Sequence, residues 1–377
     1  MPLQPEGFSV LRMRIKNIKI KNFRNYPDLD LEITGDVVVL TGPNAVGKTN
    51  LLESVYFASL FKSFRDDTEF IFLKDSNRLE LSVDIEKEGS SHALEIFLER
   101  RDKVYANFRI DGVKKKRKEA QGYVSVVVFD PTDVEMFSRP PEARRKYLNM
   151  VLCQKSPAYL EILGDYKKVL FQKTKLLLAV KQGLGSGEDL AAWNQQLVDL
   201  GSEIVLERRK FINFLNNNIS EVYTTISGFH RPVEVWYDGF EGEDKEDLGA
   251  QFFSRLEALK NKEGLLASCL VGPHRDDFSL KSEGLFLPPF SSRGELRSQV
   301  LALKILELEY LSKGEEKPIL LLDDVLSELD DTRREYLLKF LQGKFQTFIT
   351  TTMALDMPAQ HISLSPAEEV EEVGQAQ

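Results

Sequence analysis

The amino-acid sequence predicts an α/β fold with a flanking antiparallel β-sheet and an inserted α-helical lobe. Apolar runs at residues 37–40 and 319–322 indicate buried strands, and a helical segment follows each, which is typical of α/β proteins. Apolar and polar residues alternate with a period of two between residues 79 and 110, which indicates antiparallel strands. Apolar residues spaced three and four apart dominate residues 142–225, which indicates helices.

The N-terminal region is expected to supply strands to both sheets. A half-buried strand with a basic outer face runs from Met13 to Phe23, and the residues before it look like an extension without regular structure. Polar turns separate three further strands of the antiparallel sheet, and a buried strand follows them. These strands are predicted at Leu79–Glu86, Ala93–Glu99, Tyr105–Ile110 and Val124–Phe129.

The helical lobe is expected to begin after Pro140. Two helical segments, Glu142–Lys181 and Asp189–Thr225, are separated by a glycine-rich turn at Gly183–Gly187. Unbroken, each segment would span roughly 50 Å at about 1.5 Å per residue, so the pair predicts a helical hairpin. This hairpin is far too short for a long coiled-coil arm.

The C-terminal part of the chain alternates again between strand and helix. We expect a return to the α/β fold near Val271–Asp277 and a helix from Glu295 to about Lys313. The strand Ile319–Leu322, the helix Asp331–Leu341 and the strand Gln346–Thr350 follow. The predicted boundaries are 1–140 for the N-terminal part of the α/β domain, 141–266 for the helical lobe, 267–362 for the C-terminal part of the α/β domain and 363–377 for a flexible acidic tail.

The composition indicates where in the cell the protein is expected and which metal sites and disulfides are not. The 377 residues, 42% hydrophobic and 29% charged, suit a soluble protein of two or three domains. Neither an N-terminal apolar leader nor a run of about 18 apolar residues occurs, so we expect a cytoplasmic protein without membrane contact. Cys153 and Cys269 have no partner motif and the His residues have no neighbours at ligand spacing, so neither a disulfide nor zinc is indicated.

A phosphate-binding motif joins the first buried strand to the helix that follows it. The run from Gly42 to Thr49 fits the P-loop pattern, in which backbone N–H groups surround phosphates, a Lys neutralises them and a hydroxyl holds Mg²⁺. The alternative is a Gly/Pro turn that matches by chance, but the strand before it and the helix after it favour the motif. The predicted nucleotide-binding residues are Gly42, Pro43, Asn44, Ala45, Val46, Gly47, Lys48, Thr49 and Asn50.

A second motif ends the strand Ile319–Leu322. Asp323 and Asp324 follow this apolar run, where a P-loop fold places a carboxylate that reaches Mg²⁺ and a neighbour that polarises water. We therefore expect Thr49 and Asp323 to hold Mg²⁺, directly or through water. Lys48 is expected to stabilise the β- and γ-phosphates of ATP, and Asp324 to orient or deprotonate the attacking water.

A Ser/Gly turn precedes the helix predicted from Glu295. Taken alone, Ser292 followed three residues later by Glu295 is a helix-capping box. An exposed Ser and Gly at a helix N-terminus also form an anion site, and their place before a carboxylate strand matches the signature motif of ABC-type ATPases. In that superfamily the signature of one subunit closes over the γ-phosphate held by the other, so Ser292 and Gly294 are expected to contact ATP across a homodimer.

Basic residues are clustered although the formal net charge is −9. They fall on the strand from Met13 to Phe23, between residues 100 and 109, and in the run Lys114–Lys118. Such clusters are suited to DNA, while the alternative, solvated strands and a charged hairpin tip, stays open at this point. The predicted DNA-binding residues are Lys19, Lys21, Lys114, Lys115, Lys116 and Arg117.

Together these motifs resemble the RecF family of bacterial recombination proteins over nearly the whole chain from Met13. Three features depart from the family pattern. Ala45 stands where a second Gly is usual, and Asp130 stands where a small or hydroxyl residue is usual. In the signature, which is usually rich in Gln, this chain has Arg293, Glu295 and Leu296. No switch histidine is assigned. The resemblance rests on Ile20–Tyr26, Gly42–Glu53, Lys62–Arg65, Phe129–Asp133, Arg144 with Arg145, Pro157–Leu160, Gly272–Asp277 and Asp323–Asp330.

The resemblance implies an ABC-type ATPase head that uses ATP and Mg²⁺. It implies a protein that dimerises on ATP, binds double-stranded DNA at gaps and single-strand/double-strand junctions, and works with RecR and RecO to load RecA. It also implies a weak, DNA-stimulated ATPase that acts as a switch. Because Asp324 is one methylene shorter than the Glu usual in ABC ATPases, we expect slow hydrolysis.

Two other functions would share the nucleotide motifs. A chromosome-structuring, SMC-like ATPase head would need coiled-coil arms of hundreds of residues. A nucleotide-dependent nuclease component would need a further cluster of acidic metal ligands. The short helical insertion disfavours the SMC-like head, and the residues after Asp330 leave no room for the acidic cluster of a nuclease. A transporter would require a separate permease.

Overall fold

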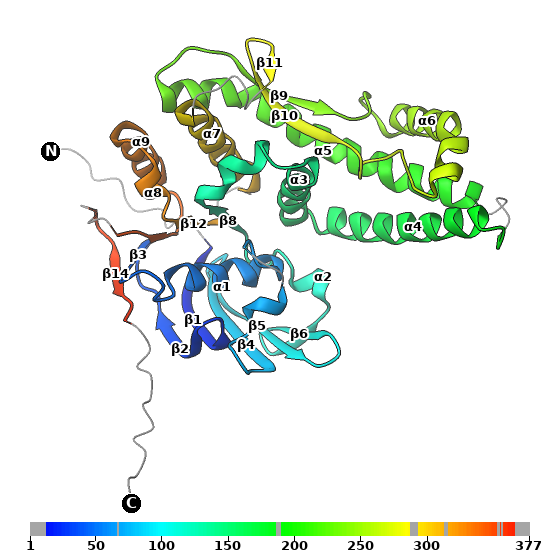
Figure 1. Cartoon of the computed structure of the whole chain (residues 1–377). Coiled ribbons are helices and arrows are strands. Elements are labelled where there is room, and N and C mark those ends of the chain that lie inside the picture. Colours follow the sequence, from blue (N-terminus) through cyan, green and yellow to red (C-terminus); the bar gives the residue numbers. More distant parts are fainter. Residues whose placement is uncertain are drawn as a thin grey trace, which may run out of the picture. The chain divides into compact units, whose positions relative to one another are not determined.

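The computed structural model describes residues 13–65, 68–185, 190–286, 293–312, 316–352, 355 and 357–365. This part of the chain packs as two compact units (Figure 1). The first unit combines Met1–Pro131 with Ser312–Gln377, and the second unit is Thr132–Leu311. The second unit is thus an insertion into the first.

The first unit contains a parallel β-sheet. Its strands are β3 (Val37–Thr41), β8 (Val126–Phe129), β12 (Ile319–Asp323), β13 (Thr347–Thr350) and β14 (Gln360–Ser363), in the order β14-β3-β13-β12-β8. Apart from β14 and the end of β3, every residue of these strands is buried, which is why they stand out as continuous apolar runs. Because the strands are parallel, both predicted nucleotide motifs begin at the same edge of the sheet.

An antiparallel sheet belongs to the same unit. Its strands are β1 (Arg14–Phe23), β2 (Tyr26–Glu32), β4 (Arg78–Lys87), β5 (Ser90–Arg100), β6 (Val104–Ile110) and β7 (Val113–Lys115), in the order β2-β1-β4-β5-β6-β7. Alternate residues of β4 and β5 are buried, so one face of the sheet is covered and the other is polar. The strands predicted at 79–86, 93–99 and 105–110 are confirmed.

Helix α1 (Lys48–Leu60) lies between the two sheets. It contacts β8 and β12 of the parallel sheet and β1 and β4 of the antiparallel sheet, and every residue from Leu51 to Leu60 is buried. A helix that is covered all round is held by packing rather than by its own propensity. Other helices of this unit, within the described ranges, are η1 (Thr68–Ile71), α2 (Arg117–Ala120), α8 (Val325–Glu328) and α9 (Asp331–Leu341).

The second unit is built mainly from long helices. They are α3 (Pro141–Lys155), α4 (Pro157–Lys181), α5 (Leu190–Ser227), α6 (Lys245–Leu266) and α7 (Arg293–Leu311), and the short 3₁₀ helix η2 (Pro131–Phe137) precedes them at the junction of the two units in the sequence. The helical segment predicted at Glu142–Lys181 consists of two helices that are separated at Ser156. Pro157 cannot continue the helical bonding of α3, and the Ser156 hydroxyl accepts from Tyr159 N at 3.3 Å as the N-cap of α4. Helices α4 and α5 then pack side by side as the predicted hairpin (Figure 1).

A small sheet completes the second unit. Its strands are β9 (Val233–Asp238), β10 (Asp277–Ser282) and β11 (Leu285–Phe286), in the order β11-β10-β9. Two ion pairs tie the start of β10 to helices: Arg208 of α5 donates to Asp276 at 3.3 Å, and Arg144 of α3 donates to both oxygens of Asp277 at 2.8 Å. These pairs explain structurally why Gly272–Asp277 and Arg144 occur in one sequence pattern.

The second unit, which is defined by the contacts among its residues, extends beyond the helical lobe predicted at 141–266. It begins at Thr132 and includes β10 and α7, because α7 packs on α5 and α3, and β10 pairs with β9. The predicted domain boundaries are drawn from the order of the motifs in the sequence. The two units are instead defined by which elements contact each other. Within the described residues, no helix combines the length and apolar character that crossing a membrane requires.

Candidate nucleotide-binding site

The loop between β3 and α1 has the backbone of a phosphate-binding loop. Gly42 (φ 141°), Ala45 (φ 65°) and Gly47 (φ 114°) all have positive φ, and only Ala45 does so with a Cβ. Gly47 also lacks space for a side chain, because an added Cβ would lie 2.6 Å from Asn25 Nδ2 and 2.8 Å from the Tyr26 hydroxyl. The conformation at position 47 therefore requires Gly, and a side chain there would also displace the ends of Asn25 and Tyr26.

The predicted nucleotide-binding residues lie at the N-terminus of α1. The helix begins at Lys48, so its unpaired backbone N–H groups and the positive end of its dipole lie at the loop. Lys48 Nζ donates to the carbonyl oxygens of Gly42 and Pro43 at 2.8 Å, which holds the ammonium over the loop. The exposed tip of the loop consists of Pro43, Asn44 and Ala45.

Asp323 and Thr49 meet at the carboxyl edge of the parallel sheet. Asp323 Oδ1 accepts hydrogen bonds from Thr49 Oγ1 and from Thr350 Oγ1, both at 2.8 Å. Only 9% of Asp323 is exposed, and this burial raises the pKa of its carboxyl, while the two hydroxyl bonds lower it. The structure thus brings together two motif residues that stand 274 positions apart in the sequence.

The oxygen atoms of this group fit Mg²⁺. A carboxylate and two hydroxyls are hard ligands of the kind that Mg²⁺ prefers, and protein sites commonly hold it through one or two carboxylates plus phosphate oxygens. A cation beside Asp323 would also offset the cost of burying its charge. Among the residues that the structure describes, no group of three or more His, Cys, Asp or Glu side chains offers another metal site.

Asp324 has a different environment from its neighbour. Its φ is 53°, its backbone N–H donates to Thr350 Oγ1 at 2.8 Å, and it is the N-cap residue of α8. Asp324 is exposed whereas Asp323 is buried. Asp324 is therefore an exposed carboxylate next in sequence to the candidate metal ligand Asp323.

The predicted signature motif lies partly outside the described residues. Ser292 is not among them, whereas Gly294 is the second residue of α7. Glu295 accepts from Arg231 Nη1 at 3.0 Å, and Ser298 Oγ donates to the Gly294 carbonyl at 3.1 Å. The described part of the motif is therefore the first turn of a helix.

The predicted DNA-binding residues form two groups, and the first lies on β1. Lys19 Nζ is 3.3 Å from Asp30, and the residues opposite Lys21 on β2 and β4 are Asp28 and Glu80. Carboxylates across the strands neutralise this part of the sheet. Lys19 and Lys21 are therefore less available to phosphate than the sequence alone indicates.

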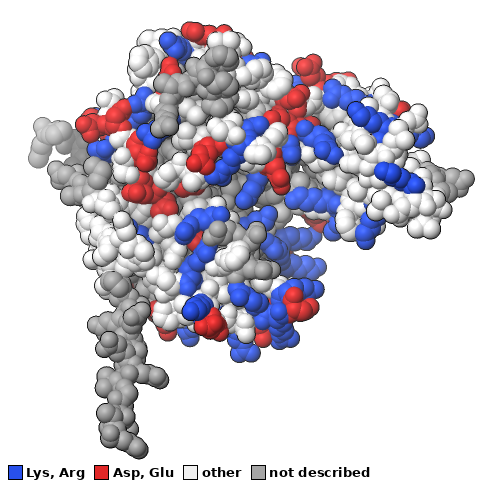
Figure 2. Space-filling model, in the orientation of Figure 1, with Lys and Arg blue, Asp and Glu red and all other residues white. Residues whose placement is uncertain are grey.

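The second group, at β7, has fewer acidic neighbours in the ladder. The run Lys114–Lys116 exposes its first and last residues, and Lys114 stands opposite Arg109 of β6. Figure 2 shows Lys and Arg side chains gathered over the surface where Figure 1 places β6 and α2. Arg117 is instead engaged with Phe61: Nη2 donates to its carbonyl at 3.1 Å, the guanidinium lies over its ring, and burial lowers the pKa of Arg117.

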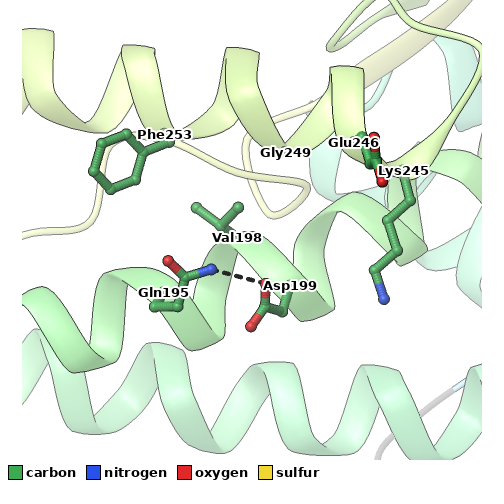
Figure 3. A pocket seen from close by; sticks show the side chains of 7 residues that line it. All are labelled: Gln195, Val198, Asp199, Lys245, Glu246, Gly249 and Phe253. Carbon is green, nitrogen blue, oxygen red and sulfur yellow. Dashed lines mark hydrogen bonds between the residues drawn. The ribbon is translucent and has the colours of Figure 1, made fainter.

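A cavity of about 460 Å³ lies between α5 and α6 in the second unit (Figure 3). Two of its polar side chains satisfy each other, since Gln195 donates to Asp199 at 2.9 Å. None of its lining residues belongs to the sequence motifs, so it is not the candidate nucleotide site. The lining residues are Gln195, Val198, Asp199, Lys245, Glu246, Gly249 and Phe253.

Sequence reasoning did not assign three residues that contact the site. Thr350 donates to Asp323, Asn25 Nδ2 donates to the Val46 carbonyl at 2.9 Å, and the Tyr26 hydroxyl donates to the Gly47 carbonyl at 3.0 Å. Asn25 and Tyr26 lie in the run Ile20–Tyr26, which carries part of the family resemblance. Nothing else in the sequence indicates that they contact the site. For Thr350, the only indication in the sequence is that it ends a buried strand, β13 (Thr347–Thr350).

Known proteins match the chain over nearly all of its length. The family model described as the RecF/RecN/SMC N-terminal domain matches residues 14–367. Proteins described as DNA replication and repair protein RecF from Bacillus cytotoxicus and Bacillus thuringiensis are each 35% identical, over 346 and 348 residues. In both cases the match covers 90% of this chain and 92% of the relative.

Solved structures match equally well. One of the recombination mediator protein RecF–ATP in the RecFOR pathway is 31% identical, with a TM-score of 0.88 over 95% of this chain and 97% of that chain. The corresponding RecF–ATPrS structure is 30% identical, with a TM-score of 0.87 over 94% and 96%. The chain therefore belongs to the RecF family, and its fold is that of an ABC-type ATPase head with a flanking antiparallel sheet and an inserted helical lobe.

Proposed function

We propose that the chain is an ATP-dependent DNA-binding protein of recombinational gap repair. The observation that carries the proposal is the hydrogen bond from Thr49 Oγ1 to Asp323 Oδ1 at 2.8 Å, beside a loop with the backbone of a P-loop. Solved relatives described as RecF–ATP and RecF–ATPrS support the nucleotide. Their description as recombination mediators supports the role in repair.

In this proposal the P-loop binds ATP through its charge and its backbone. Lys48 and the N–H groups at the start of α1 bind the β- and γ-phosphates, and Thr49 and Asp323 hold Mg²⁺. When bound, Mg²⁺ neutralises negative charge on the phosphate oxygens. Asp324 orients the attacking water or accepts its proton, and its short side chain keeps the ATPase weak.

ATP also controls assembly in this proposal. Ser292 and Gly294 of one subunit contact the γ-phosphate held by the P-loop of a second subunit, since a helix N-terminus favours an anion. The ATP-bound homodimer clamps DNA near gaps and single-strand/double-strand junctions. DNA-stimulated hydrolysis returns it to monomers, so the ATPase acts as a switch.

DNA lies along the basic end of the antiparallel sheet in this proposal. Lys114, Lys115 and Lys116 supply the main phosphate contacts, while Arg117 supports the surface through Phe61. The RecFOR pathway of the solved relatives supports RecR and RecO as partners, with the loading of RecA as the outcome.

Binding of a gapped duplex, measured by fluorescence anisotropy, tests the proposal. ATP with Mg²⁺ is expected to raise the affinity about tenfold or more, within the usual range for coupling between two sites, whereas ADP should not. Lys48→Met is the control, because it removes the ammonium that binds phosphate and should bind DNA equally with and without ATP. Wild-type affinity that does not depend on nucleotide would contradict the proposal.

A further inference from the structure

We infer that the turn between β1 and β2 is an external brace of the P-loop, in which Asn25 and Tyr26 orient the backbone N–H groups that receive phosphate. The inference rests on the proposed ATP-binding function and adds positioning residues to it. Both side chains reach the loop from outside the run Gly42–Thr49.

The two side chains donate to consecutive carbonyl groups of the loop. Asn25 Nδ2 lies 2.9 Å from the Val46 oxygen, and the Tyr26 hydroxyl lies 3.0 Å from the Gly47 oxygen. In a trans peptide, the C=O group and the N–H group of the next residue point in opposite directions. Holding the Val46 carbonyl therefore aims the Gly47 N–H away from Asn25, and holding the Gly47 carbonyl does the same for the N–H of Lys48.

The two contacts are not equally important. The Gly47 oxygen also accepts the first helical bond, from Leu51 N at 3.0 Å, so α1 helps Tyr26 to fix this peptide. The Val46 carbonyl precedes the helix and depends more on Asn25. Burial raises the pKa of the Tyr26 phenol to about 12, so its hydroxyl remains a hydrogen-bond donor at neutral pH.

A second set of contacts fixes the direction of the Asn25 amide. Asn50 Nδ2 donates to Asn25 Oδ1 at 2.8 Å, so the Asn25 oxygen faces Asn50 and its nitrogen faces the P-loop. Asn50 Oδ1 in turn accepts from Arg65 Nη1 at 3.0 Å. The chain of bonds runs from Arg65 through both amides to the Val46 carbonyl.

A buried carboxylate anchors the same turn to α1. Arg24 donates to both oxygens of Glu53, at 2.9 and 2.6 Å, and Ser63 donates to the same carboxylate, which is fully buried. Arg24 also donates to the Phe70 carbonyl at 2.8 Å. The φ of Arg24 is 53°, which is unfavourable for a residue with a long side chain. These hydrogen bonds therefore hold the turn in a backbone conformation that Arg24 does not prefer.

Asn25→Ala and Tyr26→Phe test the brace directly. Each is expected to weaken binding of a fluorescent ATP analogue about threefold to tenfold, the effect of one neutral hydrogen bond, and Asn25→Ala should have the larger effect. The KM for ATP should rise in parallel while kcat stays near the wild-type value, because the brace acts on phosphate binding. Tyr105→Phe is the matched control, since it also removes one tyrosine hydrogen bond, to Asp102 at 3.0 Å.

The possible outcomes separate this inference from the proposed function. If the wild-type protein did not bind the fluorescent ATP analogue, both the brace and the proposed ATP-binding function would be overturned. Wild-type protein that binds, together with unchanged affinity in Asn25→Ala, Tyr26→Phe and the double variant, would overturn the brace alone. A lower Tm with unchanged affinity would show a merely structural role. Tyr26→Phe retains the ring, so it decides the question if Asn25→Ala does not fold.

Discussion

At the scale of single residues, two adjacent carboxylates have separate surroundings at the candidate site. Asp323 is buried and accepts from two hydroxyls, whereas Asp324 is exposed and has a φ of 53°. Asp and Asn tolerate this left-handed conformation better than most other residues do. Asn is therefore the substitution that removes the charge of Asp324 with the least change to the backbone.

Asp324→Asn is expected to preserve the ATP-bound dimer and to slow hydrolysis about 100-fold or more, since it removes a group that activates water. Lys48→Met should instead weaken ATP binding and prevent dimerisation, because it removes the ammonium that binds the phosphates. Steady-state hydrolysis rates and ATP affinities of the two variants check this division of roles. An equal loss of ATP affinity in both would refute it.

Asp323→Asn is expected to raise the Tm of the nucleotide-free protein at neutral pH while abolishing hydrolysis. Burial raises the pKa of the folded Asp323 above its unfolded value, so the folded state binds more protons and loses stability as pH rises between the two values. Asn keeps an oxygen for Thr49 and Thr350 without carrying the charge. Thermal melts at several pH values should show the difference shrinking as pH falls, and a lower Tm at neutral pH would contradict this reasoning.

At the scale of elements, the parts predicted well are those whose burial leaves a pattern in the sequence. The strands β3, β8, β12 and β13 are fully or nearly fully buried, and the long helices carry a regular apolar face. Strand β2 was not predicted because it is an edge strand without a single buried residue, and its exposed positions include Asp28 and Asp30. Such a strand is defined by its neighbour and not by its own pattern.

At the candidate site, too, only some contacts leave a pattern in the sequence. Thr49 and Asp323 could be placed together from sequence, because the carboxyl ends of parallel strands lie at one edge of a sheet. The brace could not be predicted. Asn25 and Tyr26 each contact a carbonyl 21 positions further along the chain, and a backbone carbonyl gives no signal in the sequence.

The strand β7 supplies a test of the DNA path. Replacing Lys114, Lys115 and Lys116 with Gln is expected to weaken binding to all sequences alike, and to flatten the log K versus log salt slope by about 0.9 for each phosphate that is no longer neutralised. The matched control replaces Lys19 and Lys21 with Gln and should weaken binding less, since these residues face carboxylates. Unchanged affinity and slope in the triple variant would assign the run to a solvated hairpin.

At the scale of the whole molecule, the net charge of −9 opposes DNA binding by a single subunit except at its basic clusters. A dimer would present two copies of the run Lys114–Lys116 to one duplex, and the second copy would then bind at a high effective concentration. ATP would thereby control DNA affinity through assembly.

Molar mass in solution, measured by light scattering without nucleotide, with ADP and with ATP, shows whether ATP drives dimerisation. We expect a monomer in the first two conditions and a dimer with ATP, with the dimer most persistent in Asp324→Asn because hydrolysis is slow. Ser292→Arg should bind ATP and remain monomeric, since a bulky side chain would block the γ-phosphate of the second subunit. A monomer in all three conditions, for the wild type and for Asp324→Asn alike, would rule out control of DNA binding through ATP-driven dimerisation.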